Sequence, residues 1–122
     1  MTEVGKTLRD RSFKFALRTV KLAKFLESEK RDWILSKQVL RSGTSIGANI
    51  RESRFAQSRA DFISKLQISL KEAEETSYWL ELLQAAEFVS ETQFASLKKD
   101  LDWIIATLVK SLKTVKSHPS SS

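Results

Sequence analysis

The sequence predicts an all-α domain folded as an antiparallel up-down-up-down four-helix bundle. Only three Gly and one Pro interrupt 122 residues, which leaves few positions for the turns that strands require. Hydrophobic residues make up 41% and charged residues 30% of the chain, and the apolar residues recur at three- and four-residue spacing. Short segments between the predicted helices favour antiparallel neighbours. We expect one domain over residues 1–116 and a flexible polar tail over 117–122.

The first two predicted helices span residues 10–27 and 30–54. The core face of the first is expected to carry Phe13, Ala16, Leu17, Val20 and Ala23. The apolar stripe of the second passes through a block of small residues, in which Gly43 and Gly47 stand four apart. Such spacing leaves one flank of the helix nearly bare, so that another backbone can approach it closely. Close packing is therefore the predicted role of Gly43 and Gly47.

The third and fourth helices have recognisable N-terminal signals. Ser58 is expected to cap the third helix, which ends near Glu87, with Asp61 in its first turn. The fourth begins with the capping-box pattern Ser90-Glu-Thr-Gln93. Both helices then carry long apolar stripes that predict core-facing positions.

The residue types for most catalysis are missing. There is no Cys, and the single His118 lies beside Pro119 in the polar tail. The chain therefore lacks the residues for a catalytic relay of nucleophile, His and acid, and for a metal site with several His or Cys ligands. The acidic residues of the third helix (Glu72, Glu74, Glu75 and Glu81) are typical of a solvated face. We expect a protein that is not an enzyme and has no metal and no cofactor.

The chain has no apolar signal segment at its start, and its longest apolar run is far shorter than a membrane span of about 20 residues. We expect a cytoplasmic protein without a membrane partner. Its net charge of +6 is uneven: residues 1–60 hold 14 Lys or Arg and 6 Asp or Glu (+8), whereas residues 61–122 hold 7 and 9 (−2).

Cations repeat along one side of each of the first two predicted helices. The first stripe contains Arg11, Lys14, Arg18 and Lys21, and the second helix adds Lys37 and Arg41. A surface of this kind can bind the phosphate backbone of RNA or DNA, in a salt-dependent and sequence-independent way. A solvated charged face is the other interpretation, and the sequence leaves both open.

Some apolar residues lie away from the predicted core stripes, which indicates a second apolar face that self-association would cover. The predicted oligomer interface consists of Phe15, Leu22, Leu26, Ile68, Tyr78, Trp79 and Leu82. Scattered surface apolar residues are the alternative explanation.

The segment Ser45-Ile-Gly-Ala-Asn-Ile-Arg-Glu52 resembles the Ser-Ile-Pro-x-Asn-Ile-x-Glu signature of the bacterial 23S rRNA intervening-sequence proteins, with Gly47 in place of proline. The similarity continues through residues 58–80. It implies a cytoplasmic four-helix bundle that commonly forms a ring-like homopentamer. A relative of that family, the accessory variability determinant of diversity-generating retroelements, is a basic pentamer that binds nucleic acid and a reverse transcriptase. For Asn49, Arg51 and Glu52 we favour a structural role over ligand binding.

Two functional classes remain open. The first is a non-enzymatic homo-oligomeric scaffold or adaptor that contacts structured RNA or DNA through the basic face. The second is a protein-protein interaction module with no nucleic-acid role. The sequence does not identify the physiological partner, distinguish RNA from DNA, or fix the number of subunits.

Overall fold

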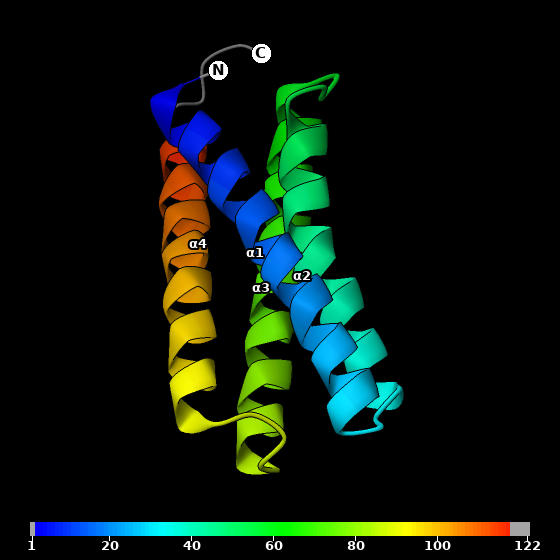
Figure 1. Ribbon diagram of the computed structural model, residues 1–122. Coiled ribbons are helices and arrows are strands. Elements are labelled where there is room, and N and C mark those ends of the chain that lie inside the picture. Colours follow the sequence, from blue (N-terminus) through cyan, green and yellow to red (C-terminus); the bar gives the residue numbers. More distant parts are fainter. Residues whose placement is uncertain (1, 118–122) are drawn as a thin grey trace.

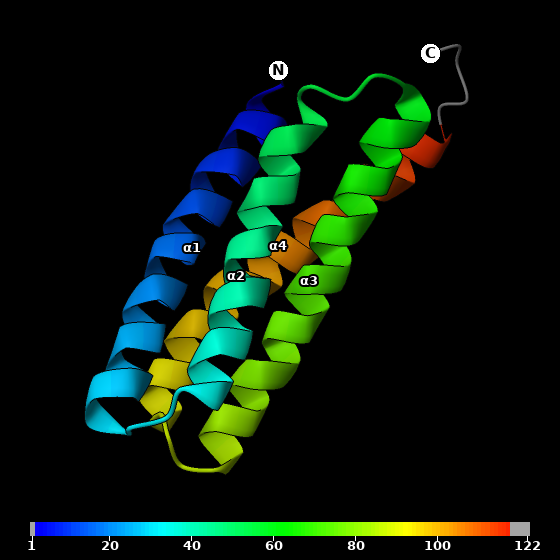
Figure 2. The ribbon, with the colours of Figure 1, turned by 90° about the vertical axis from the view of Figure 1, so that its right-hand side faces the viewer.

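The computed structural model describes residues 2–117, which form four helices and no strand. The helices are α1 (Glu3–Glu29), α2 (Ile34–Ser53), α3 (Arg59–Ala85) and α4 (Glu91–Ser117). The predicted all-α class with four helices is confirmed. Figure 1 and Figure 2 show that the chain connections alternate: α1–α2 and α3–α4 are joined at one end, and α2–α3 at the other. Ser117, predicted as the first residue of the tail, belongs to α4. The other predicted tail residues, 118–122 with His118, lie outside the described residues.

Local hydrogen bonds explain where three helices begin. Ser58 Oγ accepts from Asp61 N at 3.0 Å, and Ser90 and Gln93 form a reciprocal capping box with distances of 2.8 and 3.1 Å. Both predicted caps are confirmed. The first helix begins earlier than predicted because Thr2 caps it, its Oγ1 accepting from Gly5 N at 3.0 Å.

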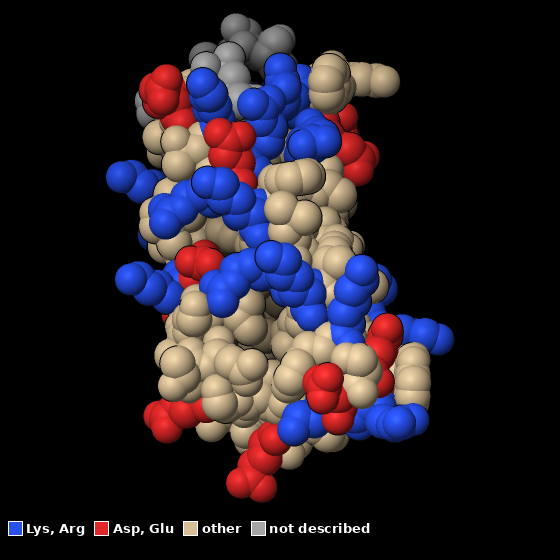
Figure 3. All heavy atoms as spheres, viewed as in Figure 1, with Lys and Arg blue, Asp and Glu red and all other residues tan. Residues whose placement is uncertain are grey.

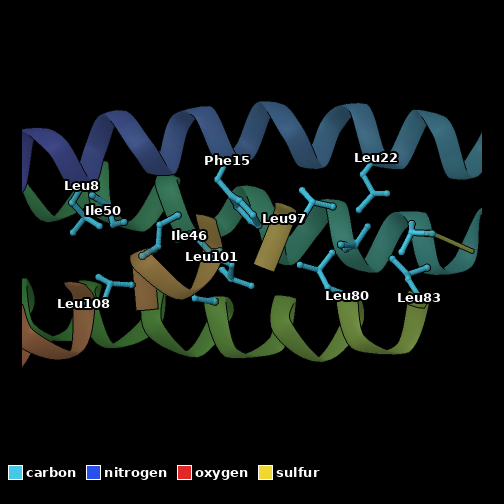
Figure 4. Close-up of a cluster of buried hydrophobic side chains, with 14 of the residues drawn as sticks. Leu8, Phe15, Leu22, Ile46, Ile50, Leu80, Leu83, Leu97, Leu101 and Leu108 are labelled. Carbon is cyan, nitrogen blue, oxygen red and sulfur yellow. The ribbon is translucent and has the colours of Figure 1, made fainter. Parts of the chain in front are cut away.

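The core runs along the bundle axis and receives side chains from all four helices. In Figure 4, Phe15 and Leu22 point from α1 into the space between the helices, with Ile46 and Leu101 on the Phe15 side and Leu80 and Leu83 on the Leu22 side. α2 contacts α1 and α3, α4 contacts α3 and α1, and within residues 2–117 α2 and α4 make no close backbone contact. The largest fully buried side chains include Phe15, Leu26, Ile46, Leu80, Leu83, Leu101, Ile104 and Leu108.

The predicted orientation of α1 is wrong. Phe15, Leu22 and Leu26, expected on an exposed second face, are 1%, 7% and 0% exposed and belong to the core. Phe13 and Leu17, expected in the core, are 52% and 49% exposed. The helix is thus rotated relative to the prediction, and its true inward stripe passes through two polar residues, Ser12 and Thr19 (both 0% exposed), which interrupt the apolar pattern.

Those polar residues are buried without penalty because each hydroxyl donates to a carbonyl of its own helix. Ser12 Oγ donates to Arg9 O at 3.0 Å, and Thr19 Oγ1 to Ala16 O at 2.7 Å. Thr19 lies against Gly43: a Cβ added at Gly43 would be only 2.5 Å from Thr19 Cγ2. α1 and α2 thus approach closely at Gly43, where any side chain would clash with Thr19.

α2 meets α3 through small polar residues in the same way. Thr76 Oγ1 donates to Ser42 Oγ at 2.9 Å, and Ser69 Oγ donates to the carbonyl of Ile46, also at 2.9 Å. Among the described residues, no buried side-chain nitrogen or oxygen lacks a hydrogen-bond partner. α2 therefore packs closely against both α1 and α3, and the buried polar groups at these two interfaces are hydrogen-bonded.

Candidate functional site

Two arginines of the predicted basic stripe of α1 contact α4. The Arg11 guanidinium lies 3.9 Å from the centre of the Trp103 ring. Arg18 Nη1 pairs with Asp100 Oδ2 at 2.7 Å, and the same guanidinium bonds Ser96. Lys14 and Lys21 are exposed and have no ion pair within residues 2–117.

The two predicted cations of α2 also differ from each other. Arg41 binds two carboxylates of α3, Glu72 at 3.1 Å and Glu75 through its second terminal nitrogen. Glu75 also accepts from Trp79 Nε1 at 3.0 Å. Lys37 is exposed. Arg11, Arg18 and Arg41 thus help to hold helices together, and the six predicted residues do not form one free cationic surface.

The fold instead gathers positive charge at one end of the bundle, where α1 starts, α2 and α3 are connected, and α4 finishes (Figure 1). We define the basic end as residues 2–11, 48–65 and 108–117. It contains ten Lys or Arg and four Asp or Glu, a net charge of +6. The opposite end, residues 21–41 and 78–98, contains seven Lys or Arg and six Asp or Glu, a net charge of +1.

Contacts between distant residues join the segments of the basic end. Arg59 Nη2, at the start of α3, donates to the carbonyl of Val115 near the end of α4 at 2.6 Å. Lys65 Nζ pairs with Glu52 at 3.4 Å. Figure 3 shows Lys and Arg side chains over the upper and middle parts of one face of the molecule, with uncharged surface and some Asp and Glu between them and further Lys and Arg near the lower end. Sequence reasoning located the charge in the first half of the chain and missed this cluster, because α4 contributes three of its ten cations.

A shallow groove between α1 and α2 borders the basic end and includes part of it. It has a volume of about 400 Å³ and lies between Arg9 and Phe13 of α1 and Gly47, Ala48 and Arg51 of α2. The Arg51 guanidinium is 5.7 Å from the centre of the Phe13 ring. The small residues of α2 were recognised in the sequence, but the groove could not be predicted from them because Phe13 was expected in the core.

The residues of the Ser45–Glu52 signature are engaged locally. Asn49 Nδ2 donates to Ser45 O at 2.9 Å within α2. Glu52 is exposed and pairs with Lys65. A Cβ at Gly47 would meet Ser12 O at 3.4 Å, an ordinary contact, so the close approach is centred on Gly43. These contacts assign Asn49 and Glu52 packing partners inside one subunit.

Of the residues predicted at an oligomer interface, Ile68 and Tyr78 are 40% and 58% exposed. Trp79 and Leu82 are half-buried, and Trp79 packs against the core with its ring in a T-shaped contact with Tyr78 at 5.1 Å. Trp33 and Ile34, at the α1–α2 connection, are 52% and 77% exposed. Val4 and Phe55, at the basic end, are 57% and 73% exposed. Exposed apolar side chains are therefore spread over α1, α3 and both ends of the bundle.

Two further properties of residues 2–117 bear on function. No group of three or more His, Cys, Asp or Glu side chains in this part of the chain is arranged to hold a metal ion. None of its helices combines the length and apolar character that crossing a membrane requires.

Comparisons with known proteins place the chain in a family. None of the curated proteins matches it. A crystal structure of a protein of unknown function from the S23 ribosomal protein family of Bacteroides thetaiotaomicron is 52% identical, with a TM-score of 0.89, and the match covers 90% of this chain and 98% of that one. The family model of the 23S rRNA-intervening sequence protein matches residues 7–110. The chain therefore belongs to the 23S rRNA-intervening sequence protein family.

Proposed function

We propose that this protein is a non-enzymatic, homo-oligomeric scaffold that binds RNA or DNA through the basic end of its bundle. The observation that carries the proposal is the charge distribution, +6 at one end and +1 at the other. Binding to a phosphate backbone depends on how many cations reach it, and three chain segments supply them here. The non-enzymatic part rests on the sequence, which has no Cys and a single His.

The experiment compares the two ends with matched charge reversals. Arg51→Glu with Arg54→Glu changes the basic end, and Lys24→Glu with Lys30→Glu changes the opposite end. Neither pair of cations takes part in an ion pair within residues 2–117, and both pairs include a cation near an aromatic ring. Fluorescence anisotropy with labelled RNA and DNA hairpins should show a loss of roughly tenfold or more for the first variant, with less than about threefold for the second. Equal losses would contradict the proposal.

Salt provides an independent check on the same interaction. With roughly four phosphate contacts, raising the salt from about 50 to 200 mM should weaken duplex binding by roughly a hundredfold. A protein that binds neither hairpin at low salt does not have the proposed function.

Self-association is supported by the exposed apolar side chains of α3, Ile68 and Tyr78. These two residues replace the buried Phe15, Leu22 and Leu26 as the side chains on which the proposal rests. Light scattering at micromolar concentration should give a mass that is a multiple of 13.9 kDa, and Ile68→Asp with Tyr78→Asp should reduce it. A monomeric wild-type protein would remove this part of the proposal.

A protein-protein interaction module is the second candidate function, and Trp33 and Ile34 favour it. These two large apolar side chains project at the end with little net charge, where a protein partner would bury them. Under this alternative, Trp33→Ala with Ile34→Ser abolishes partner binding, and nuclease treatment of a cytoplasmic extract has no effect on it.

A further inference from the structure

The groove between α1 and α2 exists because small residues of α2 lie beside a large, outward side chain of α1. Phe13 is 52% exposed, and its neighbours across the groove are Gly47 and Ala48, which fill little space. One side of the Phe13 ring is therefore open over a volume of about 400 Å³. A second hollow of about 310 Å³ adjoins it on the α1 side, where Lys14 also lies.

Positive charge surrounds this ring. Arg9 lines both hollows, as does Arg51, whose guanidinium lies 5.7 Å from the ring centre. Two carboxylates also line the hollows: Asp10 Oδ1 is 3.8 Å from Arg9 Nε, and Glu52 pairs with Lys65 at 3.4 Å. Lys14 and Arg51 have no carboxylate partner within residues 2–117. The groove combines an accessible aromatic face with cations on both helices.

We propose that this groove binds single-stranded nucleic acid, with one base stacked on Phe13 and the adjoining phosphates on Arg9, Lys14 and Arg51. Binding to single strands typically combines these two features, a cationic groove for the backbone and an aromatic ring for a base. A duplex keeps its bases inside the stack, so it can use the cations but not the ring. This inference rests on the proposed function and specifies the form of nucleic acid that this part of the basic end selects.

An acidic peptide is the competing occupant of such a groove. The single aromatic ring, the small floor formed by Gly47 and Ala48, and the three cations that line the two hollows favour a planar, highly charged ligand over a peptide anchored by several apolar side chains. The choice between them is tested below.

The test compares wild-type protein with Phe13→Ala, Phe13→Tyr and Leu17→Ala. Leu17 is a matched control because it is 49% exposed on α1, one turn further on, and does not line either hollow. Fluorescence anisotropy is measured with labelled dT12, a 12-base-pair duplex, heparin and a glutamate-rich amphipathic peptide, and thermal melts establish that every variant is folded.

Phe13→Ala should weaken dT12 binding about tenfold, while its affinities for the duplex and heparin stay within about twofold of wild type. Phe13→Tyr keeps an aromatic ring and should bind dT12 about as tightly as wild type, and so should Leu17→Ala. The inference is overturned if Phe13→Ala weakens dT12 and heparin equally, if it has no effect on dT12, or if the peptide binds more tightly than dT12 and depends on Phe13. If the duplex binds through Arg51 and Arg54 but dT12 does not depend on Phe13, the inference alone fails. If no nucleic acid binds, the proposed function fails with it.

Discussion

The two apolar stripes of α1 differ in what lies opposite them. The inward stripe, with Phe15, Leu22 and Leu26, packs into a core built from all four helices. The outward stripe contains Phe13 and Leu17, and Phe13 lies beside small residues of α2 in a groove lined by cations. Both stripes have helical spacing and comparable side chains, so hydrophobic periodicity does not distinguish a side chain that stabilises the fold from one that is available to a ligand. The neighbouring helix makes that distinction.

The largest expected effect is a difference in stability between variants of the inward stripe and variants of the outward stripe. Phe15→Ala should lower the free energy of unfolding by about 3–5 kcal/mol, because a fully buried ring is lost and a cavity remains. Phe13→Ala should cost about 1 kcal/mol or less, since half of that residue is already in solvent. Urea denaturation measures both values. Equal costs would mean that α1 does not have the rotation described here.

The next effect concerns Gly43, which sets that rotation. Gly43→Ala should destabilise the protein by about 1–2 kcal/mol although Ala is the better helix former, because the new Cβ would lie 2.5 Å from Thr19 Cγ2. Adding Thr19→Ala should recover part of this loss.

Gly47→Ala provides the control for the Gly43 prediction. Its Cβ would be 3.4 Å from Ser12 O, so the gain in helix propensity should leave the protein unchanged or stabilise it by up to about 1 kcal/mol. The melting temperature should therefore fall for Gly43→Ala and stay the same or rise for Gly47→Ala. If both lower the melting temperature equally, the contact between Thr19 and Gly43 is not what orients α1.

The smallest effect is expected on the side of α1 that faces α4. Arg18 and Asp100 form an ion pair with half-exposed side chains, so a double-mutant cycle with Arg18→Ala and Asp100→Ala should give a coupling energy below about 1 kcal/mol. The same Arg18→Ala variant should change hairpin affinity less than the Arg51→Glu and Arg54→Glu pair does. A larger loss of hairpin affinity for Arg18→Ala would indicate that nucleic acid binds the basic stripe of α1 predicted from the sequence.

Much of the fold follows from local sequence signals. The caps at Ser58 and Ser90 depend on hydrogen bonds between residues three positions apart. The close packing at Gly43 is possible because glycine has no side chain. The rotation of α1 did not follow, because Ser12 and Thr19 are polar by type yet buried, with their hydroxyls satisfied by their own helix. A hydrophobicity pattern assigns such residues to the surface and shifts the whole stripe.

The candidate site was less predictable for a related reason. A helical projection of the sequence shows Arg18 and Arg41 as surface cations. Only the tertiary structure shows that they form ion pairs with Asp100, Glu72 and Glu75. The basic end combines three segments that are separated in the chain by 36 and 42 residues. Charge counted along the sequence cannot detect a cluster that the alternating course of the helices brings together.

The most direct test of the account is an amide NMR titration of the full chain with dT12. The account predicts that the largest chemical-shift changes lie in residues 9–17 of α1 and 44–52 of α2, around the exposed Phe13 ring. Changes centred on residues 21–41, at the opposite end of the bundle, or no changes at low salt, would contradict it.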